Sequence, residues 1–253
     1  MIKFFRHIRQ KLLSENKFSR YLLYATGEII LVVIGILIAL QINNWNDLKK
    51  ERQIERQYLE ALRSEFVANL EKLDASITSC NTLAAQLGTL LTYFEPKKSD
   101  TINSATIARN FGEALRYQIN FNPNTGVQKD LISSGNLRQI RNAVLRQKIA
   151  SFDTALGEIE KQESGAIDVK DDIGKTIIKL VSMRPIFESG GSEVLGNSKF
   201  EEVDVKLVFN NMEVENNLIL YQAITKSTGL VYYTPLKKDI EGIIALIDSE
   251  LGN

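Results

Sequence analysis

Residues 21–42, YLLYATGEIILVVIGILIALQI, form one apolar stretch of 22 residues that contains a single acidic side chain, Glu28. A helix rises about 1.5 Å per residue, so this stretch reaches about 33 Å and can cross a hydrocarbon core of about 30 Å. The rest of the 253-residue chain has no comparable run. The sequence therefore predicts one transmembrane helix over residues 21–42, followed by a soluble domain.

A cleaved signal peptide is the alternative interpretation of this stretch. Its uninterrupted apolar core, residues 29–40, has 12 residues, which is within the range of signal peptides. However, no Ala-x-Ala cleavage site follows. Residues 41–45 instead resemble an interfacial collar that places Trp45 at the level of the lipid headgroups. These features favour an uncleaved anchor.

Basic residues on the two sides of the anchor indicate its orientation. Six precede it and four follow closely: Lys3, Arg6, Arg9, Lys11, Lys17 and Arg20 before, and Lys49, Lys50, Arg52 and Arg56 after. Because basic flanks stay in the cytoplasm, we expect a cytoplasmic N-terminus. In a Gram-negative cell, the anchor would then lie in the inner membrane and the soluble domain in the periplasm.

Residues 1–20 combine these basic residues with apolar ones at helical spacing, such as Ile2, Phe5, Ile8 and Leu12. A helix of this kind can lie on the inner leaflet with its apolar face toward the lipid. The alternative is a basic flank that only sets the orientation. The sequence leaves both interpretations open.

One face of the anchor helix carries Glu28, Gly35 and Ala39. Gly35 and Ala39 form a small-xxx-small pair, which lets two helices approach closely, and a carboxylate within a bilayer usually has a protein partner. We expect an interface here, with a second copy or another membrane protein. The alternatives are that Glu28 snorkels to the headgroups or, less favoured because the helix has no other ionisable group, serves an ion path.

Two motifs carry a family resemblance: GEIILVVIGILIALQINNWN at residues 27–46, and LISSGNL at residues 131–137, followed by Ile140, Asn142, Leu145 and Arg146. With these motifs, the chain resembles a family of single-pass membrane proteins abundant in Bacteroidota. The resemblance covers about residues 1–152. That family has no assigned activity, so the resemblance implies a bacterial envelope setting and no catalytic residues.

A charged juxtamembrane stalk is expected over residues 43–58, and a near-heptad apolar seam follows it. The seam comprises Leu59, Leu62, Phe66, Leu70, Leu73, Ile77, Cys80, Ala84, Leu87, Leu91 and Phe94. It could form a coiled coil between chains or the spine of a bundle within one chain. Small residues at Cys80, Ala84 and nearby Gly88 favour the bundle.

Further helices are expected over residues 104–117, 127–132, 137–163, 165–182, 203–227 and 236–251, with turn-rich sequence at residues 120–126 and 184–204. Gly135 is expected to end one helix in a left-handed conformation, and Asn136 to cap the next. Residues 230–233 could form a short strand without an obvious partner. The sequence therefore predicts an all-α protein whose periplasmic domain, residues 59–253, is an antiparallel helical bundle.

The residue inventory excludes several function classes. Basic and acidic residues balance at 31 each, which argues against a nucleic-acid partner. The chain has one cysteine, Cys80, so it cannot form an intramolecular disulfide. Its one histidine, His7, precedes the anchor, so the soluble domain cannot contain a histidine-based triad or zinc site. No Gly-rich phosphate loop occurs. Asp168, Asp171 and Asp172 fit a solvated face better than a metal site, so we expect no cofactor, no metal and no catalytic residue.

Two weaker candidates for binding remain. Arg138 and Arg141, with Arg146 and nearby asparagines, could form an anion pocket opposite the turn at residues 120–126, although ordinary surface charges are the favoured interpretation. Tyr232 and Tyr233 could clamp a ligand but are favoured as packing residues.

The sequence as a whole predicts a non-catalytic, membrane-anchored structural or interaction protein, such as a subunit, assembly factor or scaffold of an envelope complex. Its expected partners are the lipid bilayer and either a homo-oligomer or another membrane protein. The alternative function is a periplasmic helical bundle that senses a small molecule and signals through a partner.

Overall fold

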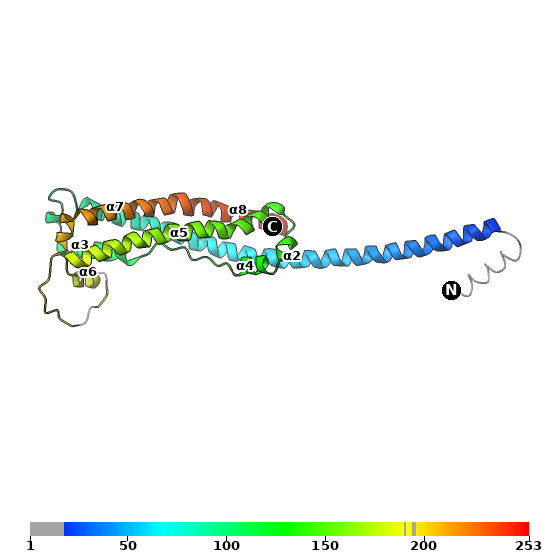
Figure 1. Cartoon of the computed structure of the whole chain (residues 1–253), viewed down its shortest axis with the longest axis horizontal. Helices are drawn as coiled ribbons and strands as arrows, with labels where there is room; N and C mark the ends of the chain where they lie inside the picture. The colour runs from blue at the N-terminus through cyan, green and yellow to red at the C-terminus, as the bar shows by residue number, and fades with distance from the viewer. Residues whose placement is uncertain (1–17, 190, 194–195, 253) are drawn as a thin grey trace. The chain divides into compact units, whose positions relative to one another are not determined.

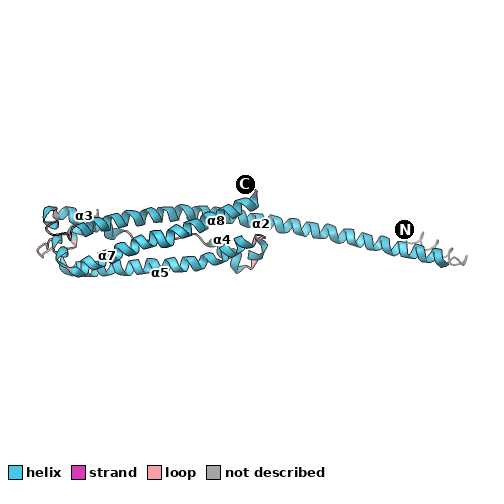
Figure 2. Cartoon of the chain, turned by 90° about the horizontal axis from the view of Figure 1, so that it is seen from above, coloured by secondary structure: helices cyan, strands magenta, loops and turns pink. Residues whose placement is uncertain are grey.

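A computed structural model describes residues 18–189, 191–193 and 196–252 (Figure 1). Most of the predicted amphipathic segment, including His7, lies outside the described residues. Every regular element in the described part is a helix, so the all-α prediction is confirmed (Figure 2). The elements are α2 (Phe18–Thr92), η1 (Ser99–Thr101), α3 (Ser104–Arg116), α4 (Gly126–Ser133), η2 (Asn136–Gln139), α5 (Ala143–Leu180), α6 (Arg184–Ser189), η3 (Val205–Asn210), α7 (Met212–Ser227), η4 (Thr228–Tyr233) and α8 (Thr234–Leu251).

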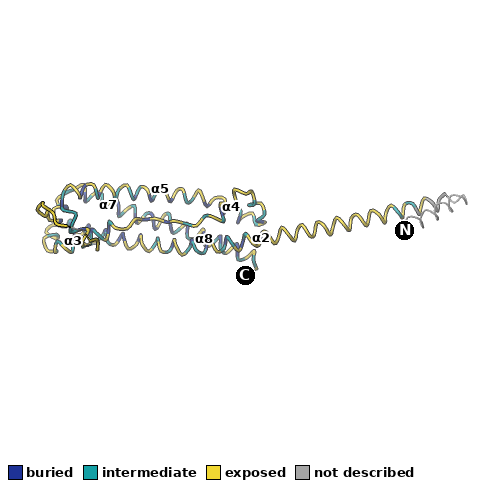
Figure 3. The backbone as a smooth tube through the Cα atoms, turned by 90° about the horizontal axis from the view of Figure 1, so that it is seen from below, coloured by how far each residue is buried: buried dark blue, intermediate teal, exposed yellow. Residues whose placement is uncertain are grey.

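The chain divides into two compact units, residues 1–56 and 57–253, and α2 contributes to both. The apolar part of α2 belongs to the first unit. Among the described residues, it is the one helix long and apolar enough to cross a membrane, by length and composition. Residues 29–42 are exposed throughout (Figure 3). A helix with apolar side chains on all faces is typical of a membrane span.

The second unit has a core built around the predicted seam. Leu62, Phe66, Leu73 and Leu87 are at most 1% exposed, so the seam packs within this unit. The Phe66 ring meets Phe152 of α5 edge-on, with ring centroids 5.0 Å apart. This packing agrees with the intramolecular interpretation of the heptad pattern, since the partner side chains come from the same chain.

Polar contacts show how α7 and α8 are aligned along α2. Along α2, Arg63 pairs with Asp248 at 2.5 Å, Asp74 pairs with Lys237 at 2.6 Å, and the carbonyl of Ala84 accepts from Gln222 at 3.0 Å. Residue numbers thus rise along α2 while those of its partners on α8 and α7 fall. Helix α5 packs against both α7 and α8 (Figure 2).

Helix α5 differs from the two helices expected over its length. It runs unbroken for 38 residues, although a break was expected before Gly165. A glycine costs a helix only about 1 kcal/mol, and Ile159, Glu163 and Ala166 continue the buried face across this point. The predicted cap at Asn136 is also wrong, because Asn142 caps α5 and accepts from the Leu145 N–H at 3.0 Å. Gly135 does adopt the predicted left-handed conformation, with φ of 72°.

The region before α8 also departs from expectation. The helix expected over residues 203–227 is divided into η3 and α7, and Asn211 caps α7 by accepting from the Val214 N–H at 3.1 Å. Residues 230–233 belong to a π-helix rather than a strand. A π-turn inserts a residue into the helical repeat, which here lets the buried face pass from Thr225 to Tyr233 without interruption.

Candidate functional site

Residues 117–125, which we call the strap, connect α3 to α4 without helical structure. The strap contains Pro123 and three asparagines, a composition that favours turns over helices. It returns the chain along the second unit from α3 to α4 (Figure 1). Backbone groups outside helices need other partners, and side chains from neighbouring elements supply several of them here.

One face of α2 supplies most of these partners. Asn69 is fully buried, and its amide bonds both backbone groups of Asn124, accepting from the N–H at 2.7 Å and donating to the carbonyl at 2.7 Å. Lys72 donates to the carbonyl of Asn122 at 3.1 Å, and Ser76 donates to that of Asn120 at 3.1 Å. The spacing of three and four residues places these side chains in one row along the helix.

Glu65 extends this row to the start of α4. Its Oε2 accepts from the Val127 N–H at 2.8 Å, and its Oε1 accepts from the Gln128 N–H at 3.0 Å. The first N–H groups of a helix have no partner inside the helix, and a negative charge there also interacts favourably with the helix dipole. Glu65 is 7% exposed, so this contact lies within the core of the unit.

Glu163 of α5 holds the strap from the opposite side. Its Oε1 accepts from the Phe121 N–H at 2.8 Å and also from the hydroxyl of Tyr233. Glu163 is 7% exposed and Tyr233 is fully buried. The other oxygen, Oε2, has no hydrogen bond within the described residues, and it is not among their fully enclosed unpaired atoms. The carboxylate therefore has one oxygen committed to the fold and one that is open.

A groove of about 600 Å³ lies between the strap and α5. Its walls are Asn120, Phe121, Asn122, Pro123, Thr125 and Lys129 on one side, and Asp153, Leu156, Gly157, Ile159, Glu160 and Glu163 on the other. The volume lies within the range of small-molecule sites. Carboxylates outnumber cations in this lining by three to one.

Burial changes the acid–base properties of the groups around Glu163. Desolvation raises the pKa of Glu163, while the hydrogen bonds from Tyr233 and Phe121 oppose that rise. Burial also raises the pKa of Tyr233, and the bond to Glu163 adds to the effect. Burial, with a contribution from the Glu163 charge, raises the pKa of Cys80 to about 11. Cys80 is therefore a thiol at neutral pH, and a thiol is a poor nucleophile and metal ligand.

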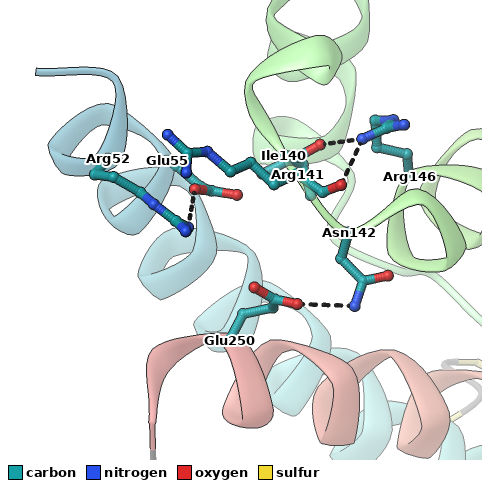
Figure 4. A network of polar contacts seen from close by, with 7 residues as sticks. All are labelled: Arg52, Glu55, Ile140, Arg141, Asn142, Arg146 and Glu250. Carbon is teal, nitrogen blue, oxygen red and sulfur yellow. Dashed lines mark hydrogen bonds and ion pairs between the residues drawn. The ribbon is translucent and has the colours of Figure 1, made fainter. Parts of the chain in front are cut away.

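The structure does not bring Arg138 and Arg141 to the groove. Both are exposed, and neither lines it. Their neighbours serve the local fold: Arg146 donates to the carbonyls of Ile140 at 2.6 Å and Arg141 at 2.9 Å, and Asn142 donates to Glu250 at 2.9 Å (Figure 4). An anion pocket at these arginines stays a prediction.

The predicted membrane-interface residues lie in the first unit. Gly35 and Ala39 are exposed, and Glu28 is half-buried. A Cβ added to Gly35 would meet no atom within 4 Å, so packing inside the described part of the chain does not require glycine there. Trp45 is 63% exposed, and the Lys49 ammonium lies 5.8 Å from its ring centroid. An interface at Glu28, Gly35 and Ala39 stays a prediction.

Sequence reasoning missed Glu163 and the polar row on α2. It favoured Tyr233 as a packing residue, and Tyr233 is fully buried, but the hydrogen bond to Glu163 was not predicted. The row did leave a signal, because Glu65, Asn69, Lys72 and Ser76 follow helical spacing directly beside the apolar seam. Glu163 left a weaker one, as an acidic residue that continues the buried positions of α5.

Comparison with known proteins places the chain in a family. A model of the family of unknown function DUF6090 matches residues 28–156, just over half of the chain. The match includes most of the apolar stretch, the polar row on α2, the strap and the first third of α5. No curated protein and no solved structure matches the chain. The chain therefore belongs to the DUF6090 family.

Proposed function

We propose that this protein is a membrane-anchored, non-catalytic interaction protein: a subunit, assembly factor or scaffold of a complex in the envelope of a bacterium such as those of the Bacteroidota. Residues 1–20 lie in the cytoplasm, residues 21–42 span the inner membrane, and an antiparallel helical bundle lies in the periplasm. The opposed order of contacts between α2 and α7–α8 supports the antiparallel arrangement.

The anchor is the observation that carries this proposal. Gly35 and Ala39 are exposed, and nothing within the described chain packs against Gly35. In a bilayer, helices associate through close packing at small residues and through polar side chains such as Glu28. A second copy or a membrane-protein partner would therefore bind through Glu28, Gly35 and Ala39.

The second unit offers further support. Its core is filled by large buried side chains, while five large apolar residues along α7 and η4 remain 46–74% exposed: Met212, Ile219, Leu220, Leu230 and Val231. These positions lie opposite the buried face of the same helices. Large contiguous apolar patches on a protein surface mark sites of interaction with proteins, membranes or ligands.

Gly35→Leu and Glu28→Ala should each weaken association of the anchor in native membranes. Leucine blocks close approach, and alanine removes an inter-helix hydrogen bond, which is typically associated with ~0.6–2 kcal/mol in membranes. Chemical crosslinking in native membranes measures the associated fraction. Leu37→Ile, on the opposite side of the helix, is the matched control. Unchanged crosslinking in both variants would mean that this face is no interface and that Glu28 snorkels.

Orientation is tested separately. A reporter that is active only in the periplasm should work when it is fused after Asn253, because six basic residues precede the anchor and four follow it. A cytoplasmic reporter at the same position should stay inactive. The opposite pattern would refute the topology and, with it, every periplasmic assignment.

The groove favours a second candidate function, a helical bundle that binds a small molecule and passes the signal to a partner. The supporting observation is a concave site of about 600 Å³ with converging polar groups beside the strap. This function keeps the membrane anchor, but the second unit would bind a small molecule in the groove.

A further inference from the structure

We propose that the groove between the strap and α5 binds a linear aliphatic polyamine, with the open oxygen of Glu163 as the acceptor for one of its ammonium groups. This inference names the ligand class for the second candidate function and rests on it. It is independent of the association of the anchor.

The state of Glu163 is the first argument. Its side chain is more than nine-tenths buried and lines the groove, yet both of its hydrogen bonds end on Oε1. Oε2 accepts no hydrogen bond within the described residues and is not fully enclosed, so a molecule in the groove can reach it. A cation that donates to a carboxylate oxygen forms a charge-assisted hydrogen bond, which is stronger than a neutral one. Oε2 is thus an accessible acceptor on a largely buried carboxylate, and an ammonium group in the groove can donate to it.

The charge of the groove is the second argument. Glu163 shares the lining with Asp153 and Glu160, and Lys129 is the one basic residue among the lining residues. The three carboxylates occur along a single helix, α5, and ten residues separate the first from the last. At about 1.5 Å per residue, they extend over about 15 Å, which suits several positive charges in line rather than one.

The rest of the lining distinguishes a polyamine from a metal ion. Leu156 and Ile159 on α5 and Phe121 and Pro123 on the strap add apolar groups to the lining, which suit methylene groups. A divalent cation instead needs several oxygen ligands around one point. No cluster of three acidic, cysteine or histidine side chains within the described residues is arranged to hold one.

Isothermal titration of spermidine into the full-length chain in detergent tests this proposal. We expect saturable binding that weakens by about tenfold or more in Glu163→Gln, because a charged hydrogen bond to the ammonium is lost. This variant keeps an acceptor at the position of Oε1, so the bonds from Phe121 and Tyr233 are retained. The matched control is Glu158→Gln, an exposed position on the same helix outside the groove, which should bind as the wild type does.

The neutral isostere 1,8-octanediol should not bind, since it lacks the ammonium groups. Absence of spermidine binding, or equal affinity in Glu163→Gln and the wild type, would overturn the proposal. A thermal-shift screen of anionic and neutral compounds on the same sample shows whether only the polyamine assignment fails or the small-molecule function fails with it. Hits there without a response to spermidine would overturn the polyamine assignment alone, whereas no hit in either experiment would overturn the small-molecule function as well.

Discussion

Replacing Glu65 with glutamine should lower the free energy of unfolding by about 2–4 kcal/mol, although the two side chains have nearly the same shape. Both carboxylate oxygens accept a backbone N–H at the start of α4, from Val127 and Gln128. Glutamine has one acceptor, so its amide nitrogen must face one of these N–H groups. At one of the two contacts, the glutamine N–H then faces a backbone N–H, so a charged hydrogen bond is lost and two donors repel each other. At the other contact, the charged hydrogen bond becomes a neutral one.

Urea denaturation of the detergent-solubilised chain, followed by far-ultraviolet circular dichroism, measures this loss. Glu71→Gln is the matched control, because Glu71 is exposed on the same helix and should change stability by no more than about 0.5 kcal/mol. Hydrogen exchange at the Val127 and Gln128 amides should accelerate in Glu65→Gln and stay unchanged in the control. Equal stability of the two variants would show that Glu65 does not fix the start of α4.

The helices themselves were largely predictable from sequence, because their signals are local. The seam residues Leu62, Leu73 and Leu87 are buried as their heptad spacing indicates, and Gly135 adopts the left-handed conformation expected after α4. The continuity of α5 was not predictable. Gly165 suggests a break, and only the packing of the helix on α7 and α8 offsets the small local preference of one glycine.

The groove was harder to foresee because its contacts join distant parts of the sequence. Asn69 and Asn124 are 55 residues apart, and Glu163 and Tyr233 are 70 apart. Periodicity shows that a residue faces the core but not which residue it meets there. The π-helix adds a further obstacle, since its extra residue changes the spacing that places Tyr233 inside the core.

Tyr233→Phe should lower the free energy of unfolding by about 1.5–3 kcal/mol near pH 8, because the hydroxyl donates to the buried carboxylate of Glu163. Phenylalanine fills the same space, so the loss reports the hydrogen bond rather than a cavity. Urea denaturation of the full chain measures it. Tyr232→Phe, a half-buried neighbour in the same π-helix, is the control and should change stability little.

The loss of stability caused by Tyr233→Phe should become smaller as the pH is lowered. The reason is the protonation of Glu163. Burial raises the pKa of Glu163 above its ordinary value of 4.5, so the folded chain holds this proton more tightly than the unfolded chain. The stability that the group contributes is fully present below about pH 4.5 and is lost as pH rises through its pKa in the folded state. The Tyr233 hydroxyl offsets part of that loss by donating to the charged form.

Removing the hydroxyl therefore matters most once Glu163 is ionised. Introducing Tyr233→Phe into a Glu163→Gln background isolates this effect, because glutamine keeps an acceptor for the hydroxyl without its charge. In that background, the loss caused by Tyr233→Phe should be smaller and independent of pH between about 4 and 8. If the loss in the wild-type background were equally independent of pH, the charge of Glu163 could not be what the Tyr233 hydroxyl stabilises.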